Sequence, residues 1–278
     1  MTTTSIAPPG LVQGVAREAL PFGLLSVVAF RTDGRWESGV EWETSTCEDA
    51  DGIADFQCEP PTTGLPKNLD KLDAPLGEAS PFTVYGHHNC SPVGITPAGA
   101  QAKADEHLAV KGPKRVEQAF WTGDLGNVPN LKDSATTLAS GAALSPTAAI
   151  AELEAHVAGT YGGRGVIHVS VAGAVHLVSA GLVKVDGGSL SLSTALGTPV
   201  VAGAGYSADG PSAAADGQFW AYVTPPVFGY RSPVNTSSNR EGDLLDRGSN
   251  DLYAIAEQTY LLGFDPCGVG AVLIDPAS

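Results

Sequence analysis

One stretch near the start of the chain constrains the fold most strongly. Arg31 to Ser80 is rich in Asp, Glu, Gly, Thr and Pro and sparse in aliphatic residues, which argues against a buried core there. The runs at its two ends, Trp36 to Thr46 and Pro81 to His87, are typical of β-strands because aromatic and β-branched residues recur in them. We therefore expect a long two-stranded protrusion with an irregular tip.

The remaining chain has the composition of a folded protein. Over the whole chain of 278 residues, hydrophobic residues make up 43% and charged residues 16%, and the length suffices for one large domain or two smaller ones. A formal net charge of −15 repels phosphate backbones, so a protein that reads nucleic acid is not expected. The apolar stretch from Ala19 to Phe30 is too short to span a bilayer and follows no basic run, so no signal peptide or membrane anchor is expected.

Several segments predict regular structure after the protrusion. Thr96-Pro97 is a helix start, and we expect a helix over 98–110, an interruption or kink at Gly112-Pro113, and a second helical piece over 114–121. Ser145-Pro146 opens another helix that ends at Gly162-Gly163. The other expected elements are a strand over 166–169, a helix over 172–180, strands within 183–201, and β-runs over 218–230, 252–264 and 269–274. The pattern predicts an α+β fold with a large appended loop.

The cysteines and histidines raise the question of a metal site. His87, His88 and Cys90, with Cys47 and Cys58 on the other arm of the protrusion, supply enough ligands for zinc, but their spacing fits no standard zinc module. We expect ordinary thiols there, and a Cys47–Cys58 disulfide is the next alternative. Four cysteines, including Cys267, are too few for a disulfide framework, so a reducing cytoplasm is the expected place of synthesis.

Other candidate sites have simpler readings. The acidic segment 49–55 lacks the closing Glu and the flanking helices of an EF-hand, so we interpret it as a solvated loop tip. Gly205 to Asp209 lacks the second glycine of a nucleophile elbow and is expected to be a surface turn. No glycine-rich loop ends in Lys-Ser or Lys-Thr. We expect neither an enzyme nor a bound cofactor or metal.

Three segments, taken in order, resemble a known framework. They are Val116 to Asp124, Leu196 to Val201, and Asn250 to Phe264 followed by the apolar run 269–274. The first is similar to the end of a long spine helix, the second to a Leu-x-Gly-x-Pro-Val element of an axial domain, and the third to terminal peripheral-domain strands. Together they resemble the HK97-type capsid fold of tailed phages, herpesvirus floors and encapsulins.

The resemblance implies a domain organisation and a function. An N-arm would occupy 1–30, an extended E-loop 31–80, a peripheral domain with the spine helix 81–135, an axial domain 136–215, and the rest of the peripheral domain 216–278. Such a major capsid protein would self-assemble into hexamers and pentamers of an icosahedral head that encloses double-stranded DNA, in the host bacterial cytoplasm and then the virion. Separate scaffolding, portal and decoration proteins would be its partners. The spine region departs from the family in being short and interrupted at Gly112-Pro113.

The resemblance also implies one possible reaction. Some family members join subunits by an isopeptide bond between an E-loop lysine and a peripheral-domain asparagine, helped by a glutamate. Lys71 or Lys67 would be the lysine, Asn250 the asparagine and Glu257 the glutamate, a buried base that takes the lysine proton. The simpler interpretation is that Asn250 and Glu257 serve strand hydrogen bonding and that the lysines are solvated.

Three other functions stay open from the sequence. An encapsulin-like nanocompartment shell would share the fold but enclose a cargo enzyme. A metal-dependent hydrolase would use His87, His88 and Cys90. A minor virion component, such as a head-decoration protein, is the third.

Overall fold

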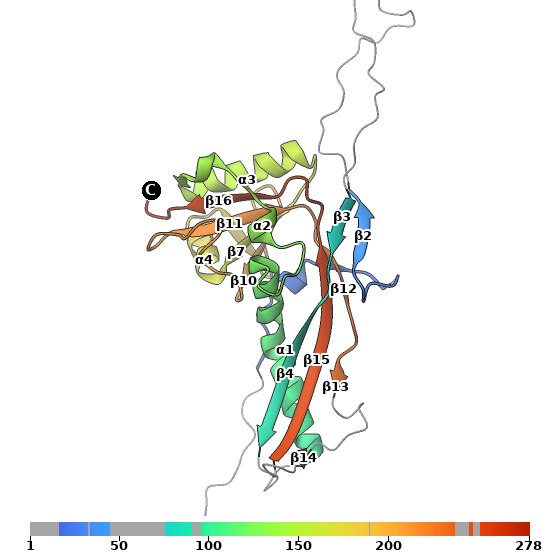
Figure 1. Cartoon of the computed structure of the whole chain (residues 1–278). Helices are drawn as coiled ribbons and strands as arrows, with labels where there is room; N and C mark the ends of the chain where they lie inside the picture. The colour runs from blue at the N-terminus through green and yellow to red at the C-terminus, as the bar shows by residue number, and fades with distance from the viewer. Residues whose placement is uncertain are drawn as a thin grey trace, which may run out of the picture.

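The protein is described from a computed structural model. It describes residues 17–32, 34–44, 76–90, 96–188, 190–236, 245–246 and 251–278. Within these ranges the chain is α+β, as predicted. Figure 1 shows a long layer built from strands β4 and β15 with helix α1 along it, a second body beside one end of this layer, and a two-stranded arm at the same end.

The long layer is a sheet organised around β15 (Asp251–Gly263). This strand pairs antiparallel with β4 (Phe82–Cys90) over nine consecutive positions, from Leu252 opposite Cys90 to Tyr260 opposite Phe82. The other strands of the sheet are β1 (Ala29–Phe30), β12 (Phe228–Arg231), β13 (Asn235–Thr236) and β14 (Leu245–Asp246). The C-terminal β-run over 252–264 is thus confirmed, and the run over 218–230 divides into two strands.

The expected partner of the first arm strand was wrong. Pro81 to His87 belongs to β4, whereas β2 (Val40–Glu43) pairs with β3 (Leu76–Ala79). The reason is that Phe82 and Val84 are buried against the helix side of the long sheet. Side chains this apolar stabilise the body of the protein more than they would a solvated protrusion.

Helix α1 (Pro97–Thr122) is continuous, so the interruption expected at Gly112-Pro113 is wrong. The Thr96 side chain accepts a hydrogen bond from the Gly99 N–H and caps the first turn. An internal proline removes one backbone hydrogen bond, here to the carbonyl of the exposed Ala109, at a cost of ~3 kcal/mol. Ten buried residues of the helix, Leu108, Val116 and Phe120 among them, offset that cost by packing.

The second body is a sheet covered by helices. Its strands in order are β5 (Thr136–Thr137), β16 (Gly270–Ile274), β11 (Phe219–Thr224), β7 (Val166–Ser170), β10 (Pro199–Gly203), β9 (Ser191–Thr194) and β8 (Val183–Asp186), with β6 (Ala143–Leu144) beside β16. Ile167 and Val169 pack in the same cluster as residues of α3 (Pro146–Thr160) and α4 (Val171–Ser179), while Val166 packs in the cluster of α1. The alternation of side chains along a strand therefore gives this sheet two buried faces.

The sequence predicted most of this second body correctly. The helices over 145–162 and 172–180, the strand over 166–169, the strands within 183–201 and the final strand over 269–274 are all confirmed, with small shifts at their ends. The short elements η1 (Leu24–Ser26), α2 (Leu131–Ser134) and η2 (Ala139–Gly141) were not predicted. In the described part of the chain, no helix is both long and apolar enough to cross a membrane.

The base of the arm has a small core, so the prediction that 31–80 buries nothing was wrong there. Trp36 is 9% exposed and stacks on Tyr230 of β12 at 5.9 Å between ring centroids. The rings of Trp42 and Phe228 pack in a T-shape, with 4.9 Å between their centroids. Two tryptophans among polar residues suffice for this contact because each buries a large aromatic surface.

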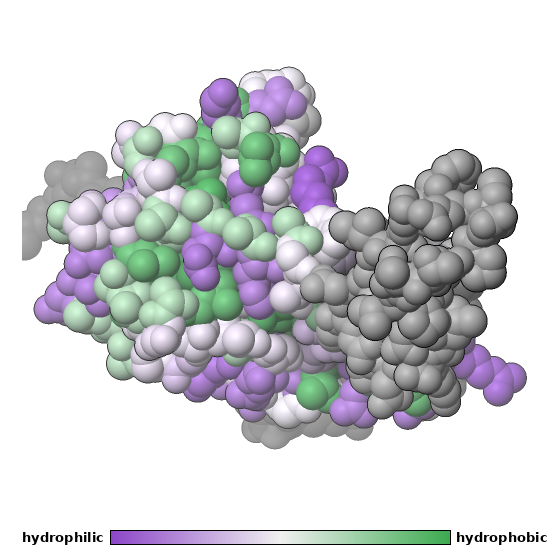
Figure 2. Space-filling model, turned by 90° about the horizontal axis from the view of Figure 1, so that it is seen from above, coloured by the Kyte–Doolittle hydropathy of each residue, from purple (hydrophilic) through white to green (hydrophobic). Residues whose placement is uncertain are grey.

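The surface also carries large apolar side chains. Figure 2 shows green apolar groups reaching the surface in several places, separated by purple hydrophilic ones. Those that lie on α4 are Val171, Val175 and Val178, which are 39%, 60% and 38% exposed. Their spacing of four and then three residues puts them on one side of the helix.

Candidate functional site

The residues proposed for subunit crosslinking are only partly described. Lys67, Lys71 and Asn250 lie outside the described residues. Glu257 lies in the middle of β15, opposite Tyr85 of β4 and Asn235 of β13, and it is half-buried rather than buried. A glutamate at this position is held by two neighbouring strands, which fits the strand role considered from the sequence as well as the role of a base.

The residues proposed for a metal site have a cationic setting. His87 and His88 lie near the end of β4, and Cys47 and Cys58 lie outside the described residues. The His87 ring lies 6.4 Å from that of His107 on α1. Burial lowers the pKa of His88, and the nearby Lys103, His87 and His107 lower it further. Among the described residues, no three His, Cys, Asp or Glu side chains are placed to hold a metal ion.

The cysteines are not all free thiols. Cys267 is 2% exposed in the turn before β16 and is disulfide-bonded. The sequence analysis predicted no disulfide at this residue. The proposed Cys47–Cys58 pair falls outside the described residues.

The most constrained polar group is a carboxylate at the C-terminal end of α1. Glu117 is 2% exposed, and its two oxygens accept hydrogen bonds from the Leu24 N–H at 3.0 Å and the Gly205 N–H at 2.8 Å. Burial raises the pKa of Glu117, and the N–H groups of Gly205, Leu24 and Ala204 partly counter this effect. One side chain thus joins three separate segments: the N-terminal turn η1, the helix α1 and the loop after β10.

A second buried polar group lies beside it. His168 of β7 is completely buried between the Tyr206 hydroxyl, 3.1 Å from Nδ1, and the Thr224 hydroxyl, 2.9 Å from Nε2. Burial lowers the pKa of His168 to about 3, so the ring is neutral. Burial also raises the pKa of Tyr206 well above its ordinary value, and the charge of Glu117 adds to this. Both rings therefore act as neutral hydrogen-bonding groups at neutral pH.

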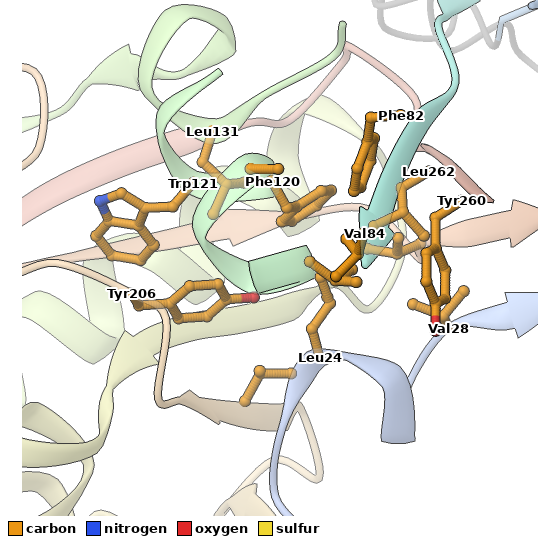
Figure 3. Packing of buried hydrophobic residues seen from close by; sticks show 14 of the residues in the cluster. Leu24, Val28, Phe82, Val84, Phe120, Trp121, Leu131, Tyr206, Tyr260 and Leu262 are labelled. Atoms are coloured by element: carbon orange, nitrogen blue, oxygen red, sulfur yellow. The ribbon is translucent and has the colours of Figure 1, made fainter. Parts of the chain in front are cut away.

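Aromatic side chains enclose these polar groups. Figure 3 shows Trp121 lying beside Tyr206, while Phe120 of the same helix turns toward Phe82. The rings of Trp121 and Tyr206 stack at 4.7 Å, and the Trp121 N–H donates to the Asp209 carbonyl at 2.8 Å. The expectation that Gly205 to Asp209 is a plain surface turn is therefore wrong for Tyr206, which is 7% exposed. An aromatic ring of this size is a buried anchor that fastens the loop to α1.

This junction has the properties of a structural connection. Its ionisable groups are enclosed, and each one has partners from distant parts of the chain: 93 residues separate Glu117 from Leu24, and 38 separate His168 from Tyr206. Sequence reasoning identified the segment from Val116 to Asp124 but not the role of its carboxylate. In the sequence, the local sign of this role is that the acidic Glu117 stands among apolar residues.

Comparison with known proteins gives the fold. No family model matches the sequence, and no curated protein matches it. Solved chains from Mycobacterium phage Ogopogo and Mycobacterium phage Cain each align with a TM-score of 0.59 at 14% identity, covering 96% and 98% of this chain and 97% and 96% of theirs. The capsid of an empty GTA particle aligns with a TM-score of 0.56 at 12% identity over 97% of this chain and 94% of that one. The chain therefore has the HK97-like capsid fold.

Proposed function

We propose that this chain is the shell subunit of a phage-type icosahedral head, which assembles into hexamers and pentamers around double-stranded DNA. The observation that carries the proposal is the likeness of nearly the whole chain to solved chains from phages and to a GTA capsid computed with C5 symmetry. Five-fold symmetry repeats a subunit five times around its axis, which supports pentamers in the proposal. Likeness over the whole length favours the shell itself over a minor virion component.

The shape of the subunit supports assembly. The arm strands β2 and β3 lie at one end of the long sheet and point away from the second body (Figure 1). A two-stranded sheet has little stability alone, and the described part of this one packs on β12 through Trp36 and Trp42. An arm of this kind gains stability when it lies on a neighbouring subunit.

The valines on α4 supply a second contact. Val171, Val175 and Val178 form an exposed apolar side of the helix, and Leu196 and Val185 of the same body are 76% and 50% exposed. Apolar residues gathered on one body of a soluble subunit mark an interaction surface. A second copy of the same body is the partner that closed rotational symmetry brings to it.

The proposal includes the domain boundaries and partners expected from the sequence. Residues 1–30 form the N-arm, 31–80 the E-loop, 81–135 and 216–278 the peripheral domain, and 136–215 the axial domain. Scaffolding, portal and decoration proteins would be separate partners, with assembly in the bacterial cytoplasm and residence in the virion. The isopeptide bond between Lys71 or Lys67 and Asn250, with Glu257 as the base, is a hypothesis for the assembled shell.

Electron microscopy of the expressed chain, alone and with the proteins of its neighbouring genes, tests the proposal. We expect closed shells from the wild type and from Leu125→Glu, because Leu125 is 67% exposed but lies away from α4. We expect Val175→Glu to prevent them. Soluble monomers under every condition would contradict the proposal. Shells that contain a protein cargo and no nucleic acid would instead indicate the encapsulin-like alternative.

A further inference from the structure

The outer side of α1 carries a row of basic side chains, three of them permanent cations, that the proposed shell function does not by itself explain. Lys103, His107, Lys111 and Arg115 follow one another at intervals of four residues, and all four are exposed. A helix rises about 6 Å in four residues, so the row extends over about 18 Å. We call these four residues the cationic row.

More cations lie beside the row. Two neighbouring hollows of about 370 and 410 Å³ lie between α1 and β4, and they share His87, His107 and Lys111 as lining residues. The smaller hollow is also lined by Arg17, His88 and Lys103, and the larger by Arg115. Among the described residues, the acids that line them are Glu106 and Asp124.

This clustering is unusual for the chain. The protein has 15 Lys and Arg against 30 Asp and Glu, and a net charge of −15. Around the two hollows, however, four permanent cations (Arg17, Lys103, Lys111 and Arg115) face two carboxylates. The positive charges affect one another, since Lys103 and His107 contribute to the lowered pKa of His88. A surface of this kind attracts a polyanion even when the whole molecule does not.

We propose that the cationic row binds the phosphate backbone of double-stranded DNA without reading its sequence, so that this side of α1 faces the inside of the shell. The inference rests on the proposed function, which places DNA within reach. Each strand of a duplex carries a phosphate every 3.4 Å along the axis, so about five per strand lie along 18 Å. Lys103, Lys111 and Arg115 are about 12 and 6 Å apart along the helix, so they contact phosphates at several points on the backbone, whatever the bases are.

The chain itself contains one competing polyanion. The arm segment 45–59 carries five acids at uneven intervals: Glu48, Asp49, Asp51, Asp55 and Glu59. The same acids in a second copy are the competing ligand. Regular spacing along a straight helix favours the duplex, and an experiment can compare the two ligands directly.

The test measures binding of a fluorescein-labelled 20-base-pair duplex of random sequence to the full-length unassembled chain by anisotropy, between 50 and 200 mM NaCl. The variant is Lys103→Gln with Lys111→Gln. The control is Lys132→Gln with Lys184→Gln, which removes the same two charges from exposed positions on α2 and β8. Glutamine keeps the helix propensity of lysine, so the variant should fold.

We expect weak binding that the control pair retains and the α1 pair loses. Each phosphate contact contributes about 0.9 to the slope of log K against log salt, so the α1 pair should lower this slope by about 1.8. Over a fourfold rise in salt, the wild type should then lose about 12-fold more affinity than the variant. Equal binding by variant and control would overturn the proposal.

A second arm of the experiment separates the alternatives. A synthetic peptide of residues 45–59 is titrated against the preformed duplex complex at 50 mM NaCl. If the peptide binds the wild type more tightly than the duplex does, and loses binding in the α1 pair, the row is a contact between subunits and the proposal fails. Closed shells without duplex binding would also defeat it while leaving the shell function intact. Duplex binding without shells would contradict only the shell function.

Discussion

Removing the Glu117 carboxylate should weaken the subunit more than any other change of a single polar group at the junction. Glu117→Ala leaves the N–H groups of Leu24 and Gly205 without their acceptor in a site that water does not reach. An unsatisfied buried donor costs about 1–3 kcal/mol, so two of them cost about 2–6 kcal/mol. Because removal of the charge also relieves its burial cost, we expect a loss of about 3 kcal/mol in the free energy of unfolding.

The substitution Glu117→Gln separates the loss of the negative charge from the loss of both acceptor oxygens. The amide keeps one acceptor oxygen, but its NH₂ group faces one of the two N–H donors, so we expect a loss of about 1–2 kcal/mol. Glu106→Ala and Glu106→Gln are the controls, since Glu106 is an exposed glutamate on the same helix. Surface changes of that kind should stay within about 0.5 kcal/mol.

Urea unfolding of the unassembled subunit measures these differences. The fluorescence of the buried Trp121 and Trp220 reports the transition, and the slope with urea shows whether unfolding remains two-state. A loss below about 1 kcal/mol in Glu117→Ala, with an unchanged slope, would refute the reasoning, because the two donors would then have found other partners.

The same carboxylate gives a pH dependence of known sign. Burial raises its pKa in the folded state above the ordinary 4.5, so the folded protein holds this proton more tightly than the unfolded chain. The free energy of unfolding that it contributes is fully present below pH 4.5 and falls as the pH rises through the folded pKa. The advantage of the wild type over Glu117→Gln should therefore shrink from pH 4 to pH 7. An advantage that grows over this range would contradict the assigned direction.

Three further predictions concern other parts of the molecule. Gly86→Ala should lower the free energy of unfolding by about 1–3 kcal/mol, because the added Cβ would lie 2.7 Å from the Leu108 backbone nitrogen. Gly159→Ala has no atom within 4 Å of the added Cβ and should raise the free energy of unfolding by up to about 1 kcal/mol. Urea unfolding measures both changes. The His168 ring signals should not move in NMR spectra between pH 8 and 5. The stability that this neutral ring contributes should be lost as the pH falls from 6.5 toward its folded pKa of about 3. Titration near pH 6.5 would show that the ring is not enclosed. Boiled shells should give a monomer band on denaturing gels, because Glu257 is only half-buried between two strands; a ladder of multimers would establish the crosslink.

The sequence predicted elements best where a local pattern had no competitor. Helix α3 begins after Ser145 and has Ile150, Leu153 and Val157 on its buried side, so capping and periodicity agree. The arm strands were assigned less well because β4 is equally strand-like and lies directly after β3 in the chain. Only the pairing of β4 with β15, more than 160 residues later in the sequence, separates the two, and single-sequence patterns contain no pairing information.

Helix α1 shows a different limit. A proline at 113 correctly predicts a lost backbone bond, but whether the helix breaks depends on the packing that opposes it. That packing comes from β4 and β15, whose partnership was unknown. The role of Glu117 was hidden for the same reason, since its hydrogen-bond donors lie 93 and 88 residues away.

Net charge misleads in a related way. A value of −15 averages over every surface of the chain, whereas a duplex responds to charges within about one Debye length, roughly 10 Å at 0.1 M salt. The cationic row is longer than that distance, so a duplex lying along it is exposed mainly to the row and to the cations beside it. The acidic remainder of the chain limits binding elsewhere on the subunit. A shell lined in this way would hold DNA weakly at defined positions and repel it from the rest of its wall.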